Sequence, residues 1–211
     1  MKYRVCLPLA ILLFAPSFGL AQSPPPKPPK ALNALALSGE SIAVLPLTLT
    51  ASEPVLLRDT TLVQLRDRRG LLRWADSVIA DGLEARAPEV SWVLPARLRQ
   101  IARRNPGMIV EPEHMGQAIL RSPKLKRVPD PLRTSLRNLT SFTGGRYAMV
   151  PAALVFARDT SGGLRADLSI ALADSRTGTV AWHALTWGIG ASPDEALTAA
   201  VAAVLPVSSG P

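Results

Sequence analysis

The 211-residue sequence predicts an α/β fold in which helices pack on one face of a mostly antiparallel sheet. Three observations predict it. Residues 41–49 form a short apolar run that is partly β-branched, as in a buried strand. Residues 69–87 repeat apolar side chains at three- and four-residue steps, whereas residues 164–174 alternate at two-residue steps. The predicted order is β-α-β, a helical insertion, then β-β-β-α, which is typical of a layered α/β domain.

The first half supplies a strand, a helix and a second strand. Pro46 lacks a backbone donor, so the strand at 41–49 is expected to end or to lie at an edge there. Residues 51–67 are expected to form a loop with a short helix. The helix at 69–87 ends before Pro88, and its polar residues are assigned to the solvent side: Arg73, Asp76, Asp81 and Glu84. Residues 90–94 form the second short strand.

The helical insertion spans residues 97–143. Pro95 opens its first helix, at a position where a missing donor costs little. A short helix is expected over 112–120, and a third helix with Asp130 as its cap. Gly144 and its neighbour then end this third helix.

The last third predicts a central strand, a hairpin and a final helix. Residues 147–157 are almost continuously apolar, and 164–174 alternate apolar and polar side chains. Asp174 to Gly178 has turn chemistry, so residues 179–189 return as the antiparallel partner. Ser192 to Glu195 has the pattern of a capping box, and the alanine-rich helix behind it ends at Pro206. Residues 41–206 are therefore expected to form one domain, with a disordered tail at 207–211.

The start of the chain predicts export. Residues 1–21 have the layout of a signal peptide, with a short basic start, an apolar run and small residues up to Ala21. The expected location is the bacterial periplasm, either soluble or loosely associated with the outer membrane, and this argues against nucleic acid as a partner. Residues 22–40 form a proline-rich leader. The only cysteine, Cys6, lies within the signal, so no disulfide is expected.

Basic residues are concentrated in the insertion. Removing Lys2 and Arg4 with the signal leaves 22 basic and 16 acidic residues, a net charge of +6. Ten of the basic residues lie between Arg97 and Arg137, where only three acidic residues oppose them. Such a segment favours an anionic membrane surface or an acidic protein partner, or is simply a solvated face. The residues expected to contact an anionic partner are Arg97, Arg103, Arg104, Lys124, Lys126 and Arg127. Trp187, which lies close to two glycines, is a further predicted contact residue, because it is an aromatic side chain that is expected to be exposed.

Catalytic patterns are poorly represented, and no catalytic residue or cofactor is assigned. Cysteine–histidine chemistry is excluded in the mature chain, and no serine elbow, phosphate-binding loop or dinucleotide fingerprint occurs. Glu111, Glu113 and His114 could offer a metal three ligands, but their spacing matches no zinc pattern. A secreted metal-assisted hydrolase using these three residues stays open as an alternative.

Five short motifs resemble a known family. They are Ile42–Leu47, Trp74–Leu83, Val93–Leu98, Gly145–Val150 and the hairpin Asp174–Trp182. Together they resemble the α/β domain shared by curli-secretion lipoproteins, outer-membrane activators of penicillin-binding proteins, and the amino-terminal domain of the Tol-system propeller protein. The resemblance implies an envelope domain that binds proteins and performs no reaction. The chain departs from the pattern in lacking a lipobox and in its long basic insertion.

The leading hypothesis is thus a non-enzymatic periplasmic accessory or assembly protein, which binds an envelope protein or an anionic envelope surface. The alternatives are the metal-assisted hydrolase and a structural subunit of a homo-oligomer.

Overall fold

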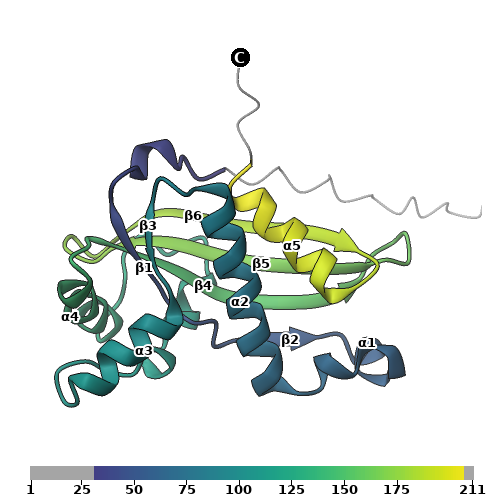
Figure 1. Cartoon of the computed structure of the whole chain (residues 1–211). Coiled ribbons are helices and arrows are strands. Elements are labelled where there is room, and N and C mark those ends of the chain that lie inside the picture. Colours follow the sequence, from purple (N-terminus) through teal and green to yellow (C-terminus); the bar gives the residue numbers. More distant parts are fainter. Residues whose placement is uncertain (1–30, 207–211) are drawn as a thin grey trace, which may run out of the picture.

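The computed structural model describes residues 31–206. The signal peptide predicted at 1–21, the first part of the leader and the tail predicted at 207–211 lie outside the described residues. Six strands form one sheet in the order β3-β1-β4-β5-β6, and β2 pairs with β4 (Figure 1). The strands are β1 (Ser41–Val44), β2 (Thr50–Ser52), β3 (Ser91–Val93), β4 (Tyr147–Arg158), β5 (Leu164–Asp174) and β6 (Thr179–Gly190).

The helices lie between these strands in an order close to the prediction. The α-helices are α1 (Pro54–Arg58), α2 (Arg68–Arg86), α3 (Pro95–Arg104), α4 (Leu132–Thr143) and α5 (Pro193–Val204). The short 3₁₀ helices are η1 (Leu35–Leu37), η2 (Thr60–Leu65), η3 (Pro112–His114) and η4 (Gln117–Arg121). The region at 51–67, expected to be a loop with one short helix, therefore contains β2, α1 and η2.

The sheet is mixed, and its long pairings are antiparallel. β4 pairs with β5, and β5 with β6, over almost their whole lengths in the antiparallel sense. The short strands β1, β2 and β3 are parallel to their neighbours, over three residue pairs in each case. The predicted α/β class with a mostly antiparallel sheet is confirmed.

Helices cover both faces of the sheet, whereas the sequence predicted helices on one face only. The first layer is α2 and α5, which lie side by side against strand residues such as Val44, Met149 and Ile170 (Figure 1). The insertion helices α3 and α4 pack on the opposite face, against Ala43 and Val150. The reason is that the insertion carries its own apolar side chains, and these bury the small side chains on that face of the sheet.

Two details of the insertion differ from the prediction. The single helix expected over 112–120 is two 3₁₀ turns, η3 and η4, because Gly116 between them has a positive φ of 75°. Asp130 does not cap α4, which begins at Leu132 without a side-chain cap. The Asp130 carboxylate instead accepts a hydrogen bond from the Thr134 hydroxyl at 3.2 Å.

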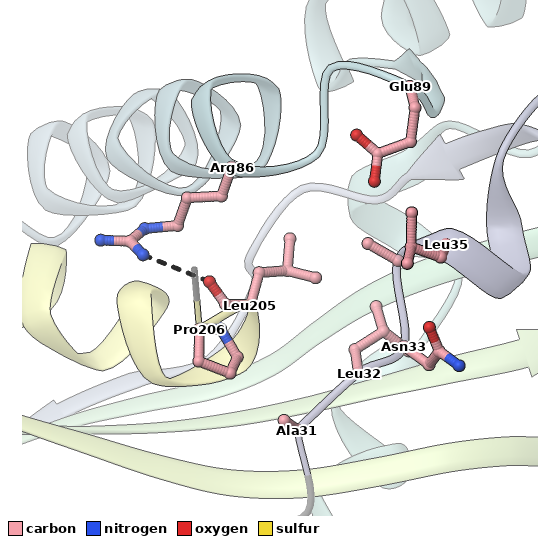
Figure 2. A pocket seen from close by; sticks show the side chains of 9 residues that line it. Ala31, Leu32, Asn33, Leu35, Arg86, Glu89, Leu205 and Pro206 are labelled. Carbon is pink, nitrogen blue, oxygen red and sulfur yellow. Dashed lines mark hydrogen bonds between the residues drawn. The ribbon is translucent and has the colours of Figure 1, made fainter. Parts of the chain in front are cut away.

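Residues 31–40, assigned by the sequence to the leader, pack on the body of the domain. Leu32 and Leu37 are buried in the same core as α2 and α5. The Leu32 amide donates to the Val204 carbonyl at 3.0 Å, and the Arg86 guanidinium donates to the Leu205 carbonyl at 3.2 Å. Figure 2 shows the pocket of about 410 Å³ that both ends of the described chain line. The two leucines explain the difference, because burying their apolar side chains stabilises the folded chain, and a solvated leader would not have this stabilisation.

Candidate functional site

One part of the sheet is left uncovered on the face opposite α2 and α5. Alternate residues of β5 share a face, and Ala171 and Ala173 lie under the insertion helices. On the same face, η4 reaches Ser169, whose hydroxyl donates to the Arg121 carbonyl at 3.2 Å. Beyond this point the side chains of β4, β5 and β6 are open to solvent. This open sheet face consists of Val155, Ala157, Arg165, Asp167, Leu185, Trp187 and Ile189.

The open sheet face is mainly apolar. In register, Asp167 pairs with Val155 on one side and with Trp187 on the other. The next row contains Arg165 and Ile189, again as direct partners. The exposed fractions are 56% for Leu185, 41% for Ile189, 39% for Trp187 and 38% for Val155. Four large apolar side chains on one uncovered face form a patch of the kind that marks an interaction site.

An ion pair holds the centre of this face in place. The Arg165 guanidinium donates through Nε and Nη2 to Asp167 Oδ1, at 2.9 and 2.7 Å. The same guanidinium lies 5.3 Å from the centre of the Trp187 ring, within the range of a cation–π contact. The Trp187 side chain is therefore fixed before any partner arrives, which reduces the entropy lost on binding.

β6 is also the edge strand of the sheet. Residues 126–128 pair only with its beginning, where the Val180 amide donates to the Lys126 carbonyl and the Val128 amide to the Gly178 carbonyl, both at 2.9 Å. Past this point, no strand within residues 31–206 pairs with the outer edge of β6. The open sheet face thus ends at an available strand edge, where another chain can add main-chain hydrogen bonds.

The six basic residues predicted to contact an anionic partner are all exposed, and three of them line three different pockets. Arg97 lines a groove of about 470 Å³ beside Phe142. Arg103 lines a different pocket, next to Glu111 and Glu113. Lys126 lines a third pocket on the other side of the insertion. The remaining three basic residues are Arg104, Lys124 and Arg127.

Of the alternative metal ligands, Glu111 and His114 contact each other, whereas Glu113 is bound to an arginine. Glu113 forms an ion pair with Arg99. His114 Nδ1 lies 3.5 Å from Glu111 Oε2, and both side chains are largely exposed. Across the described part of the chain, no three His, Cys, Asp or Glu side chains are grouped so that they could hold a metal ion.

A buried ion pair was missed by the sequence analysis, which assigned Asp76 to the solvent side of its helix. Asp76 is only 8% exposed, and its carboxylate accepts hydrogen bonds from the Leu47 amide and from Arg99 Nη2, both at 2.7 Å. Its burial is possible because these donors replace water. A signal was present in the sequence, since Asp76 lies at helical spacing from Leu72 and Ile79 within the apolar stripe of α2.

None of the helices in residues 31–206 is long and apolar enough to cross a membrane.

No protein-family model matches the chain, and no curated protein matches its sequence. Several solved structures are similar to it. The PelC dodecamer from Paraburkholderia phytofirmans is 16% identical, with 84% of this chain and 91% of that chain covered and a TM-score of 0.36. The LpoB C-terminal domain from Salmonella enterica is 11% identical, with 71% and 82% covered and a TM-score of 0.38. Lipoprotein GNA1162 from Neisseria meningitidis is 16% identical, with 72% and 82% covered and a TM-score of 0.35.

Proposed function

We propose that this chain is a non-enzymatic accessory or assembly protein of the bacterial cell envelope, and that it binds a protein partner through the open sheet face. The observation that carries the proposal is the exposed apolar group formed by Leu185, Trp187, Ile189 and Val155. Location in the envelope rests on the signal peptide predicted at 1–21.

A protein partner suits this face better than an anionic surface does. Its only charged side chains, Arg165 and Asp167, neutralise each other, so the face attracts neither anions nor cations strongly. Tryptophan and arginine are the side chains most often found at the energetic centre of protein interfaces. Arg97, Arg103 and Lys126 of the insertion line three different pockets, and none of these pockets includes a residue of the open sheet face.

The test is site-specific photo-crosslinking in intact cells. A photoreactive amino acid at position 185 samples the open sheet face, and the same amino acid at position 35 serves as the control, because Leu35 is also exposed but lies on η1. The proposal expects a discrete protein adduct at position 185 that is absent at position 35. Mass spectrometry then identifies the adduct partner.

The identified partner is purified, and its affinity for the chain is measured. Trp187→Ala is expected to weaken binding at least about tenfold, as for an aromatic residue at the centre of an interface. Leu35→Ala is expected to leave the affinity unchanged. Equal adducts at both positions, or unchanged affinity in Trp187→Ala, would refute the proposal.

A second copy of the same chain is the alternative occupant, because β6 offers both an apolar face and an edge for pairing. This homo-oligomeric alternative predicts adducts of the chain with itself at position 185. It also predicts a particle larger than a monomer by light scattering, which Leu185→Asp would dissociate.

A further inference from the structure

A second site lies in a cleft of about 510 Å³, between α2 and the insertion. α2 supplies one wall with Arg69, Leu72, Arg73 and Asp76. Leu72 and Arg73 are adjacent, and each lies three or four residues from Arg69 and from Asp76, so the four share one side of the helix. The volume lies within the usual range of ligand-binding pockets. This cleft shares no residue with the open sheet face.

The inner wall of the cleft is held by a chain of ion pairs. Arg99 on α3 binds Asp76 on α2 and Glu113 on η3, and so connects the insertion to the first helical layer. Burial raises the pKa of Asp76 and outweighs the hydrogen bonds from the Leu47 amide and Arg99. The Arg99 pKa is also raised, because its bonds to Glu113 and Asp76 together outweigh the opposing effect of burial. Arg99 is therefore fully engaged, and the inner wall carries one net negative charge.

The outer wall carries two free cations. Arg69 and Arg73 are exposed on successive turns of α2, and the Arg73 Nε donates only to the Arg69 carbonyl, at 3.4 Å. In residues 31–206, neither guanidinium forms an ion pair with a carboxylate. Two like charges four residues apart on a helix repel each other, so an anion between them relieves this repulsion. Guanidinium groups bind carboxylates with two parallel hydrogen bonds, which adds direction to the attraction.

We propose that this cleft binds an acidic peptide segment of a partner protein, with a glutamate or aspartate carboxylate held by Arg69 and Arg73 and a neighbouring apolar side chain against Leu72. The half-buried Leu72 lies between the two arginines and provides the apolar contact. Glu113 remains 37% exposed on the facing wall and offers an acceptor for a peptide amide. The same negative wall disfavours a phosphate with two charges, and this favours a singly charged carboxylate.

The experiment measures the affinity of the purified chain for two fluorescein-labelled peptides, acetyl-Ala-Leu-Glu-Leu-Ala-amide and the same peptide with glutamine in place of glutamate. The glutamate peptide is expected to bind at least about tenfold more tightly, because charge-assisted hydrogen bonds are stronger than neutral ones. The double variant Arg69→Gln/Arg73→Gln is expected to remove this preference. The matched control is Arg137→Gln, which replaces an exposed arginine on α4.

Circular dichroism establishes that the exposed-site variants remain folded. Equal affinity for the two peptides, or an unchanged preference in the double variant, would overturn the proposal. Inorganic phosphate is added as a competitor in a further arm. Displacement of the glutamate peptide by phosphate at equimolar concentration would identify a general anion site and would also overturn it. Trp187→Ala is expected to bind the glutamate peptide normally, so this test and that of the open sheet face fail independently.

Discussion

Replacing Asp174 by asparagine is expected to destabilise the chain in a pH-dependent way. Asp174 ends β5, and its carboxylate accepts a hydrogen bond from Arg146 Nε at 2.9 Å. The Arg146 guanidinium lowers the pKa of Asp174 from 3.8 to about 2, with further help from the backbone amides of the hairpin turn. Asparagine keeps an oxygen for the amides of Arg176 and Thr177, at 2.9 and 3.2 Å in the native chain, but carries no charge for Arg146.

The magnitude follows from the shift in pKa. A native pKa of about 2 against 3.8 corresponds to about 2 kcal/mol of unfolding free energy at neutral pH. This contribution is complete above about pH 5, because the carboxylate is then ionised in both the folded and the unfolded chain. It is lost as the pH falls towards 2, since the unfolded chain takes up the proton first. Asp174→Asn should therefore lose about 2 kcal/mol at pH 7 and little at pH 2.

The assay is urea denaturation followed by tryptophan fluorescence, repeated between pH 7 and pH 2. Asp81→Asn, which replaces an exposed aspartate on α2 that forms no ion pair among residues 31–206, is the matched control for the loss of a carboxylate. The difference between Asp174→Asn and the native chain should shrink steadily below pH 4. A difference that is absent at pH 7, or that stays constant down to pH 2, would show that Arg146 does not stabilise the ionised Asp174 side chain.

Three further predictions concern stability. Gly188→Ala should cost about 3 kcal/mol or more in thermal unfolding, because its Cβ would lie 2.3 Å from the Ala196 carbonyl oxygen and 2.4 Å from the Ala200 amide nitrogen. Gly163→Ala, whose Cβ would have a flexible Ile189 methyl group as its nearest neighbour at 3.0 Å and no backbone atom nearer than 3.6 Å, should cost much less, and equal losses would contradict this explanation. Arg99→Met should cost about 3 kcal/mol in urea unfolding, since it leaves the Asp76 carboxylate buried without its cation, and adding Asp76→Asn, which removes the charge but keeps an oxygen for the Leu47 amide, should recover most of the loss. Ser192→Ala should cost about 1 kcal/mol in the same assay, because its hydroxyl caps α5 by accepting from the Glu195 amide at 3.2 Å, whereas Ser141→Ala on α4 should be nearly neutral.

The β5–β6 hairpin shows what the sequence alone can predict. Two-residue alternation places β5 at 164–174, with the bounds that the structure has. The turn follows from Asp174, which accepts two backbone hydrogen bonds, and from Gly178, which has a positive φ of 70°. The start of α5 was also predictable, because the capping serine and the proline after it act locally. Each of these features depends on residues that are close together in the sequence, so the sequence alone can predict it.

The parts that were not predicted depend on contacts between distant segments. The apolar stripe of α2 indicates that Asp76 is buried, but its partner Arg99 lies 23 residues later, and no local pattern specifies their contact. The insertion covers a second face because its apolar residues meet small side chains of β1 and β4, and both strands appear in the sequence only as continuous apolar runs.

The open sheet face had a signal that was not used. In β6 the inward residues are small, with Ala184, Thr186 and Gly188 against α5, and the outward residues Leu185, Trp187 and Ile189 are large. This reversal of the usual pattern follows from the close approach of α5, which leaves no room for large side chains on its side. Large apolar residues on the side of a strand that faces away from its helix therefore indicate an interaction surface.

Residues 31–35 lie against the end of α5, and this contact determines where the two ends of the described chain lie. Residues 31 and 206 line the same pocket, so the two ends of the described chain lie close together (Figure 2). α5 has 12 residues and so places this point about 18 Å along the helix axis from the far end of β6. A tether at either end therefore acts as the same pivot, around which the domain can turn without covering the distal part of the sheet.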